Sequence, residues 1–214
     1  MARPLFIVFE GIDGSGTTTQ SQMLASHVAQ LGYPVVHTRE PGGTPLAERI
    51  RRLVLDRGSE DVHHLAELLL YAASRAQHVG EVIAPSLQAG TPVICDRYVA
   101  STLAYQGYGR QLDLQVVLQV NAIAAGGCLP DATVYLDLPV AAAIARRRTR
   151  GLPEDRLEAA GAAFQERVLA GYRQLVAQDP DTTVVLDGGI GRNDLAQMIR
   201  QELTQRWPRF PFSM

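Results

Sequence analysis

A glycine-rich segment near the N-terminus carries the first residues with recognisable chemistry. Residues 11–20 read GIDGSGTTTQ, and the spacing of Gly11, Gly14 and Gly16 lets the main chain curl with several N–H groups turned inward. Such a loop holds a polyphosphate when it joins a strand to the N-terminus of a helix, because the helix adds partial positive charge. Thr18 stands where a hydroxyl usually binds Mg²⁺. The residues expected to bind ATP are Gly11, Ile12, Asp13, Gly14, Ser15, Gly16, Thr17 and Thr18.

Thr17 departs from the pattern of such loops. The pattern G-x-x-x-x-G-K-[ST] has lysine at this position, and threonine offers one neutral hydroxyl where lysine would bring a positive charge to the donor phosphates. Losing one preorganised donor at a transition state typically costs about 10² to 10³ in rate. Glycine-rich turns also serve purely structural ends, so the loop alone does not establish phosphate binding.

Asp13 is a carboxylate inside the predicted phosphate loop. A negative charge there repels bare phosphates, so it needs a role such as orienting a sugar hydroxyl or helping to place Mg²⁺. The simpler alternative is that Asp13 only caps the turn through neighbouring main-chain N–H groups.

Two charged residues directly follow a short apolar stretch in the middle of the chain. Asp96 and Arg97 come after residues 93–95, so in a parallel sheet they would stand at the carboxyl edge, where α/β sheets bind ligands. A planar guanidinium there can clamp a phosphate with two hydrogen bonds, and we expect Arg97 to hold the phosphate of an acceptor. A structural ion pair between the two residues is the alternative.

The elements that must position these residues follow from apolar patterning. Short apolar strands are expected at 4–10, 34–40, 93–96, 132–138 and 183–187. A helix follows the loop and stops near Gly32, and further helical patterns lie around 45–56, 61–89, 98–106, 112–125, 139–149, 157–178 and 193–206. Connections of this length join parallel neighbours. We predict an α/β protein with the three-layer α/β/α P-loop NTPase fold, a five-stranded parallel sheet and a single domain over residues 1–214.

Composition excludes several classes of function. The 20 basic and 22 acidic residues nearly cancel, so no global positive field favours a nucleic-acid polymer. No apolar stretch approaches the length that crosses a bilayer, and we expect no membrane partner. Cys95 and Cys128 are too few for a disulfide framework, which suits the cytoplasm.

Several short segments share their order and spacing with one family of kinases. They are FEGIDGSG at 9–16, TTQ at 18–20, TREPGGT at 38–44, LYAASRAQH at 70–78, DRY at 96–98 and STLAYQG at 101–107. Together they resemble the thymidylate kinase family, and the resemblance covers nearly the whole chain. A basic run at Arg146, Arg147, Arg148 and Arg150, followed by Asp155 and Arg156, is similar to the mobile lid of that family.

The resemblance implies roles for individual residues around thymidine monophosphate. Tyr71 would stack on thymine, Arg75 would donate to a base carbonyl, and Thr102 would contact the base edge. Tyr105 would lie near the sugar 2′ position, where its bulk rejects ribonucleotides. For Tyr71, packing in the core is the alternative. The residues expected to bind dTMP are Asp13, Arg39, Pro41, Tyr71, Arg75, Arg97, Ser101, Thr102, Tyr105 and Gln106.

The same resemblance implies the metal ligands and the lid. Thr18 and Asp96 would bind Mg²⁺. The lid would span about 146–157, with residues 151–153 as a hinge, and Ser15 together with the basic lid indicates the bacterial branch in which the lid supplies an arginine. We expect a lid arginine to replace the charge missing at Thr17. The residues expected in phosphoryl transfer are Asp13, Arg97, Arg147, Arg150 and Arg156.

The expected reaction transfers the γ-phosphoryl group of MgATP to dTMP, with Mg²⁺ as the cofactor. The alternatives are a catalytically impaired nucleotide-binding protein, because of Thr17, or a kinase for another nucleoside monophosphate. The resemblance also implies a homodimer. Its face would come from the apolar helices around 61–73 and 113–125, although ordinary core packing explains these helices equally well.

Overall fold

The sheet at the centre of the molecule contains five parallel strands. The computed structural model describes residues 4–59, 62–151 and 153–208. The strands are β1 (Phe6–Glu10), β2 (Val36–Arg39), β3 (Val93–Asp96), β4 (Ala132–Asp137) and β5 (Thr183–Asp187), and they lie in the order β2-β3-β1-β4-β5. All four pairings are parallel, which confirms the predicted sheet and places the phosphate loop after its middle strand.

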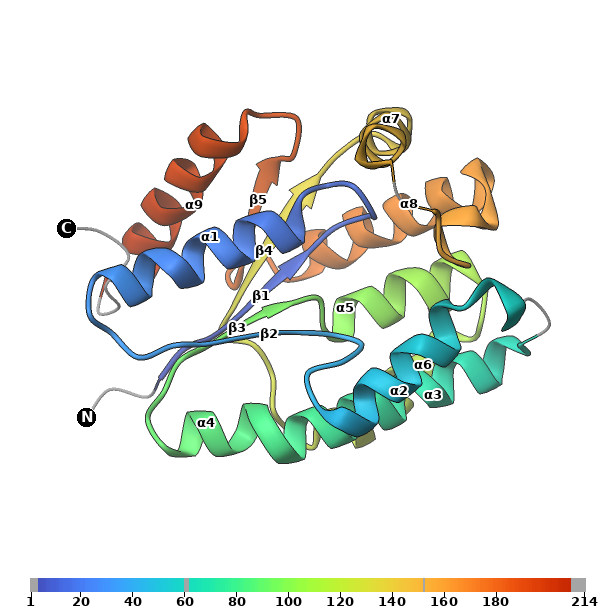
Figure 1. Ribbon diagram of the computed structural model, residues 1–214, viewed down its shortest axis with the longest axis horizontal. Coiled ribbons are helices and arrows are strands. Elements are labelled where there is room, and N and C mark those ends of the chain that lie inside the picture. The colour runs from blue at the N-terminus through green and yellow to red at the C-terminus, as the bar shows by residue number, and fades with distance from the viewer. Residues whose placement is uncertain (1–3, 60–61, 152, 209–214) are drawn as a thin grey trace.

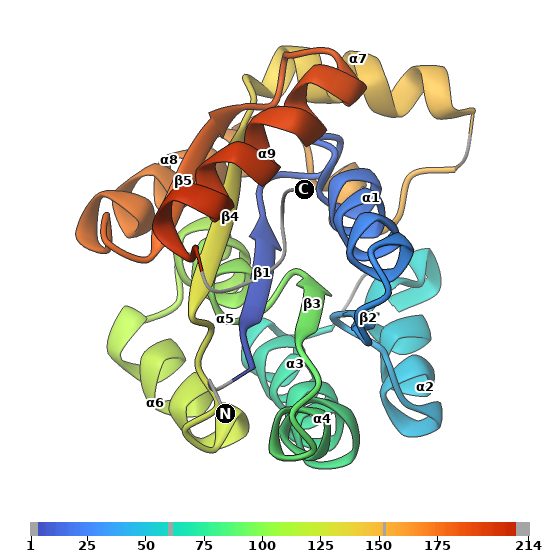
Figure 2. The ribbon, with the colours of Figure 1, turned by 90° about the vertical axis from the view of Figure 1, so that its left-hand side faces the viewer.

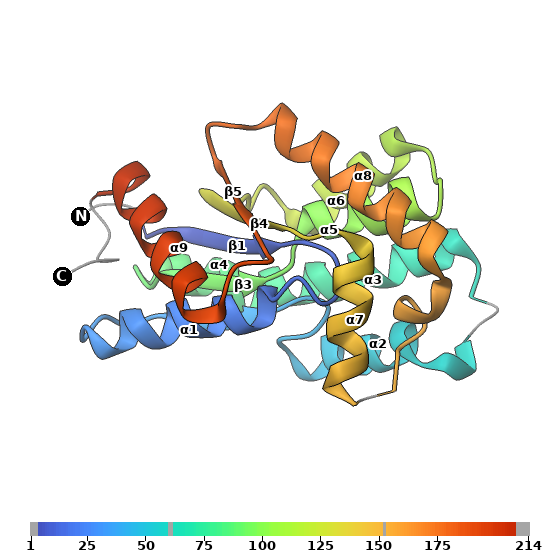
Figure 3. The same cartoon turned by 90° about the horizontal axis from the view of Figure 1, so that it is seen from above.

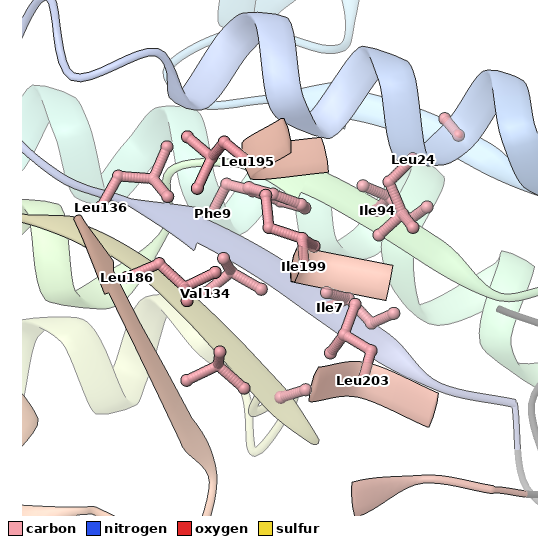
Figure 4. Packing of buried hydrophobic residues seen from close by; sticks show 13 residues of the cluster. Ile7, Phe9, Leu24, Ile94, Val134, Leu136, Leu186, Leu195, Ile199 and Leu203 are labelled. Carbon is pink, nitrogen blue, oxygen red and sulfur yellow. The ribbon is translucent and has the colours of Figure 1, made fainter. Parts of the chain in front are cut away.

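The residues of β1 are buried on both faces of the sheet, which explains why this strand is nearly continuously apolar. Ile7 and Phe9 point to one face and join the largest core cluster, while Phe6 and Val8 point to the other. Figure 4 shows the first of these clusters, in which Leu195, Ile199 and Leu203 of the last helix cover the strands. Glu10 ends the strand as a buried carboxylate.

Helices cover both faces of the sheet and give the predicted three layers (Figures 1 and 2). Helices α1 (Thr17–Gln30) and α9 (Arg192–Arg206) pack on one face. The opposite face is covered by α3 (His64–His78), α4 (Ala84–Gln88), α5 (Val99–Thr102), α6 (Leu114–Ala125) and α8 (Ala162–Gln178). Helix α2 (Pro45–Leu55) packs on α3, and α7 (Val140–Arg150) passes across the end of the β1–α1 loop (Figure 3).

Two predicted helices contain wider π-helical turns. The helix expected over 61–89 consists of α3, a π-helical segment at Val79–Ile83 and α4, with residue 61 outside the described residues. The widened turn ends two residues before Pro85, whose missing N–H interrupts the regular ladder of helical hydrogen bonds. The helix expected over 98–106 consists of α5 and a π-helical segment at Leu103–Gly109. Segments of this kind are frequent at functional sites.

The helix expected over 157–178 begins later than predicted. A short 3₁₀ turn at Glu158–Ala160 ends at Gly161, and α8 starts at Ala162. Gly161 has φ 92°, a conformation that favours glycine and separates the two elements. Among the helices of the described part, none is long and apolar enough to cross a membrane.

Candidate active site

The β1–α1 loop has the geometry of a phosphate-binding loop. Gly14 and Gly16 have φ values of 96° and 105°, which glycine adopts without strain, and Gly16 directly precedes the first residue of α1. The first N–H groups of a helix have no partner within it, so the start of α1 presents donors and partial positive charge to an anion. The loop therefore fits the predicted ATP phosphate site in every respect except the side chain of Thr17, which is 4% exposed.

A hydroxyl and a carboxylate meet beside this loop. Thr18 Oγ1 donates to Asp96 Oδ2 at 2.5 Å, although the two residues come from α1 and the end of β3. The second carboxylate oxygen, Asp96 Oδ1, is buried and has no hydrogen-bond partner in the part of the chain that is described. A buried carboxylate oxygen without a partner is costly unless a cation or water satisfies it.

This pair fits a magnesium ion. Mg²⁺ is usually held by one or two protein oxygens together with waters and substrate phosphates, so it needs no cluster of acidic residues. The described residues contain no group of three or more His, Cys, Asp or Glu that would form such a cluster. Thr18 and Asp96 are the oxygen donors that fit the ion.

A hollow at the carboxyl edge of the sheet collects most of the residues predicted to bind dTMP; we call it the inner hollow. It is lined by Asp13, Glu40, Pro41, Arg51, Leu55, Tyr71, Arg75, Arg97, Tyr98, Ser101, Thr102, Tyr105, Gln106, Asp155 and Leu157. Among the residues predicted to bind dTMP, Arg39 is the one that does not line the inner hollow in the described part of the chain. An aromatic ring, a buried guanidinium and hydroxyl groups thus face one space of the kind that binds a nucleotide.

A second hollow, which we call the loop hollow, lies over the phosphate loop. It is lined by Asp13 to Gln20, Arg39, Glu40, Arg51, Asp96, Arg97, Arg146, Arg147, Arg150, Pro153, Asp155, Glu158, Gly188, Ile190, Arg192 and Leu195. The two hollows share Asp13, Glu40, Arg51, Arg97 and Asp155. Two phosphate-bearing ligands, one in each hollow, would therefore meet at Arg97 and Asp13.

Arg97 stands at the junction and is held on several sides. Its Nη2 donates to Asp13 Oδ1 at 2.8 Å and its Nη1 donates to the carbonyl of Gly11 at 2.6 Å. Desolvation would lower the pKa of Arg97, but the neighbouring Tyr105 hydroxyl and Asp13 carboxylate outweigh it and the pKa is raised, so the guanidinium stays charged. Its φ of 72° is rare for any residue other than glycine and is the kind of strain found at functional sites.

Tyr105 connects the phosphate loop to the inner hollow. The Tyr105 hydroxyl donates to Asp13 Oδ2 at 2.8 Å and accepts the main-chain N–H of Asp13 at 3.1 Å. The π-helical segment that carries Tyr105 thereby fixes the Asp13 carboxylate between a phenol and the guanidinium of Arg97. This arrangement goes beyond capping of the turn, which was the simpler alternative for Asp13.

Arg75 lies at the floor of the inner hollow with 2% of its surface exposed. Its Nε donates to Glu40 Oε2, its Nη1 to Asn121 Oδ1, and its Nη2 to Thr102 Oγ1 and the carbonyl of Tyr98. These four bonds leave one of the five guanidinium N–H groups for a ligand. Arg75 is therefore oriented by its neighbours and can offer a single directed donor to a base.

The folded chain matches one known family by sequence and by structure. A family-wide sequence profile described as "Thymidylate kinase" matches residues 9–199. The chain belongs to the thymidylate kinase family. A relative named thymidylate kinase from Geobacter sulfurreducens is 46% identical over 209 residues, covering 95% of this chain and 98% of the relative. Another, from Syntrophotalea carbinolica, is 49% identical over 187 residues, covering 85% and 87%. The crystal structure of thymidylate kinase from Ehrlichia chaffeensis superimposes with a TM-score of 0.78 at 33% identity, covering 94% of this chain and all of that one.

Two arginines predicted for the thymidylate kinase site lie elsewhere in this structure. Arg39 lines the loop hollow and not the inner hollow, because its Nη2 donates to both carboxylate oxygens of Glu48 at 2.9 Å. Arg156 lines neither hollow, as far as the described residues show. It is 7% exposed, its Nε donates to the carbonyl of Val54, and its Nη2 lies 2.6 Å from Glu67 Oε2. In this conformation Arg156 holds the lid segment against α2 and α3.

Several charged and phenolic residues of the site were not among the predicted ones. Glu40, Arg51 and Asp155 line both hollows, while Glu10 and Tyr172 lie behind Arg97. The position of Arg51, on a helical stretch with further arginines nearby, resembled an ordinary solvated helix face. Tyr172 lies 75 positions from Arg97 in the sequence, so only tertiary structure reveals their contact.

Tyr172 orients Arg97 from below. Its hydroxyl donates to the buried Glu10 carboxylate at 2.9 Å and accepts from Arg97 Nη1 at 3.2 Å. Burial and the nearby Glu10 raise the pKa of Tyr172, so the phenol keeps the proton that it donates.

Replacing Tyr172 with phenylalanine should therefore disturb Arg97 without disturbing the core. The ring contacts with Tyr105 and Tyr135 remain. The hydrogen bonds of the hydroxyl with Glu10, Arg97 and Ser101 are lost, each with a net value of about 0.5 to 1.5 kcal/mol. We expect KM for dTMP to rise about three- to tenfold while KM for ATP stays within twofold. The control is Tyr135→Phe, which removes a buried hydroxyl bonded to Asp137. Equal effects of the two variants on KM for dTMP would contradict the assignment.

Glu67 is a buried carboxylate beneath the inner hollow that binds the lid segment to α3. It is fully buried and contacts Gln106, Arg110 and Arg156. Burial alone would raise the pKa of Glu67, but the Gln106 hydrogen bond and the two arginines outweigh it, and the pKa is lowered.

Glu67→Ala is expected to lower the free energy of unfolding by about 3 to 5 kcal/mol, because it leaves two arginine charges without their buried partner. Urea denaturation measures this, with the exposed Glu81→Ala as a control. A lowered pKa stabilises the fold above the unfolded value and loses that contribution as pH falls through the folded value. The difference in unfolding free energy between the wild type and Glu67→Gln should be constant near neutral pH and shrink below pH 4.5, the ordinary value for glutamate. A difference that grows on acidification would refute this role.

Proposed function

We propose that the protein phosphorylates dTMP to dTDP with MgATP, in the synthesis of dTTP. Family membership over nearly the whole chain supports the reaction class and the acceptor. The single observation that carries the proposal is the junction of the two hollows at Asp13 and Arg97, with the polar floor of Arg75 and Thr102 on one side and the phosphate loop on the other.

The geometry supports an in-line transfer. A dTMP phosphate oxygen beside Arg97 attacks the γ-phosphorus of ATP held on the loop, and the bond from that phosphorus to the β,γ-bridging oxygen breaks, giving dTDP and ADP. The attacking oxygen is already anionic near neutral pH, so no protein nucleophile or strong base is needed. Catalysis rests on alignment and on neutralising charge. Thr18 and Asp96 would hold Mg²⁺, which supplies charge neutralisation on the donor phosphates when bound.

Within the inner hollow we assign the base to the region of Tyr71, Arg75 and Thr102, and the phosphate to Arg97 and Ser101. Tyr71 is half-buried and faces the hollow, so its ring is available for stacking. Tyr105 lies between these two regions, next to Asp13, where the sugar of a bound nucleotide must pass. Gln106 and Pro41 complete the wall.

We also propose a single domain with a lid at about 146–157. Gly151, with φ 69°, ends α7, and residue 152 of the predicted hinge lies outside the described residues. Arg150 is 44% exposed in its side chain and donates to Glu158, so its release on closure is one movement that would bring charge to the donor.

A homodimer is a further part of the proposal. Helices α3 and α6 pack together and carry exposed apolar side chains, namely Leu65, Leu69, Val116, Leu118 and Ile123. Exposed apolar side chains on two packed helices support a protein interface. A mass of one chain by size exclusion with light scattering would refute the homodimer.

We place the protein in the cytoplasm, where ATP and dTMP are present.

The test of the reaction is direct. Purified protein is incubated with MgATP and each nucleoside monophosphate in turn, and ADP and nucleoside diphosphate are measured. We expect turnover with dTMP to exceed that with the other monophosphates. Absence of dTMP-dependent ADP formation would refute the proposed function.

A further inference from the structure

Lysine is absent from the whole chain and not only from position 17. All 20 residues counted as lysine or arginine are arginines, and the sequence contains no lysine at all. Every cationic role in this protein, including the one that the phosphate-loop pattern gives to lysine, must therefore be carried by a guanidinium. The structure can show which one lies on the loop.

Three arginines of the loop hollow are bound to carboxylates. Arg39 binds both carboxylate oxygens of Glu48, and Arg150 does the same with Glu158. Arg97 binds Asp13 at the junction with the inner hollow. Each would have to break an ion pair before it could neutralise the donor phosphates.

Arg147 differs because it is buried against the phosphate loop. The neighbouring Arg146 is exposed, and its Nη1 reaches the carbonyls of Gly14 and Ser15 only at 3.5 Å. Arg147 comes from α7, is 4% exposed, and its Nη1 donates to the main-chain carbonyl of Asp13 at 2.9 Å. A side chain built at Gly14 would place its Cβ 2.7 Å from the carbonyl oxygen of Ala143 and 3.3 Å from Cγ of Arg147. The glycine at position 14 thus permits α7 to pack directly on the loop, and Figure 3 shows the helix beside it. Arg147 lies at this contact.

The guanidinium of Arg147 also has unused donors. Its Nε is buried and has no hydrogen-bond partner within the described ranges. The nearest carboxylates are at ion-pair distance only, with Glu154 3.8 Å from Nη2 and Glu158 4.0 Å from Nε. A buried, charged N–H without an acceptor is costly, and a phosphate oxygen is the acceptor that the surroundings of the loop imply.

We propose that Arg147 is the resident replacement for the lysine of the phosphate loop. It neutralises the charge that develops on the β,γ-bridging oxygen as the bond from that oxygen to the γ-phosphorus breaks and the dTMP oxygen forms the new bond. No proton moves in this step. The guanidinium of Arg147 is held on the loop by the carbonyl of Asp13 before any lid movement, whereas Arg150 is bound to Glu158. The inference rests on the proposed function for its kinetic part, and its binding part stands without it.

The first test compares Arg147→Gln with Arg148→Gln. The second variant is the control, because it removes one charge from an exposed position of the same helix. We expect Arg147→Gln to lower kcat by about 10²-fold, the effect of losing one preorganised donor, and to weaken ADP binding about tenfold in calorimetry. Arg148→Gln should leave both within threefold. Equal behaviour of the two variants would overturn the proposal.

The second test restores the charge from the other side of the loop. Thr17→Lys combined with Arg147→Gln should recover at least tenfold of the rate that Arg147→Gln alone loses. If Arg147 only held the loop in shape through Asp13, a lysine at position 17 would recover nothing, and that result would overturn the proposal.

A folding defect is separated from the proposed role by a third variant and by the binding measurement. Arg147→Lys keeps the charge, and we expect it to bind ADP more tightly than Arg147→Gln does. Thermal unfolding is recorded for each variant. A wild-type protein that binds ADP but shows no dTMP turnover refutes the proposed function only, whereas unchanged ADP affinity in a folded Arg147→Gln variant refutes the role of Arg147.

Discussion

Replacing Arg97 with alanine is expected to lower kcat/KM for dTMP by about 10³-fold or more, the largest effect of any single substitution in this site. Arg97 is charged, largely buried and shared by both hollows, and two of its N–H groups are fixed by Asp13 and the carbonyl of Gly11. Removing one preorganised donor typically costs about 10² to 10³. Here the loss also leaves the Asp13 carboxylate without its cationic partner, so the negative charge of Asp13 repels the acceptor phosphate. Steady-state kinetics with dTMP varied at saturating MgATP measures the effect.

Arg173→Ala is the control for this substitution. Arg173 is another arginine paired with an aspartate, Asp137, but its side chain is 53% exposed and outside both hollows. We expect its kcat/KM to stay within twofold of the wild type. ADP affinity should also survive in Arg97→Ala, because the phosphate loop is intact. A decrease in kcat/KM below tenfold would show that Arg97 does not hold the acceptor phosphate.

We expect the second large effect for Asp96→Asn, which should lower kcat by about 10²- to 10³-fold. The Oδ1 atom of Asp96 is buried without a partner in the described chain, and its Oδ2 receives the Thr18 hydroxyl. A bound divalent cation typically stabilises a transition state by several kcal/mol, and each 1.36 kcal/mol corresponds to a tenfold change in rate. Asparagine keeps the shape and removes the charge. The activity should also require a higher Mg²⁺ concentration, which a titration of the variant measures.

Asp113→Asn provides a comparison for the loss of one acidic charge. Asp113 caps α6 at the surface and receives the N–H of Gln115, far from either hollow. Its kcat and Mg²⁺ dependence should match those of the wild type. An unchanged Mg²⁺ dependence in Asp96→Asn would remove Asp96 from the proposed metal site.

The sheet and the phosphate loop could be predicted from sequence because local patterns determine them. Residues 6–9 are apolar since both faces of β1 are covered, and the glycines that follow are needed for φ values that other residues rarely adopt. Strand β3 ends at Asp96 and is followed by Arg97. The edge of the sheet that carries the site therefore follows from the order of the strands. The acceptor residues, in contrast, could be named only through the family resemblance.

What could not be predicted depends on contacts between distant segments. Arg39 and Arg156 have the right residue type, but Glu48 and Glu67 are placed by the fold to bind them, and no local pattern indicates those pairings. The wide turns at Leu103–Gly109, which carry Tyr105 and Gln106, lack a simple periodic signature. Tyr172 had the appearance of a core residue, and it is one, yet its hydroxyl reaches Arg97.

The contact of Arg147 with the phosphate loop has a chemical consequence for how this enzyme can be modified. Reagents and metabolites that form imines or amides, such as aldehydes and acyl phosphates, react with the neutral amine of lysine and not with a guanidinium, which stays protonated. A nucleotide site whose every cation is arginine presents no such amine. Acylation, a common means of silencing lysine-dependent enzymes, therefore has no target among the groups that neutralise the phosphates here.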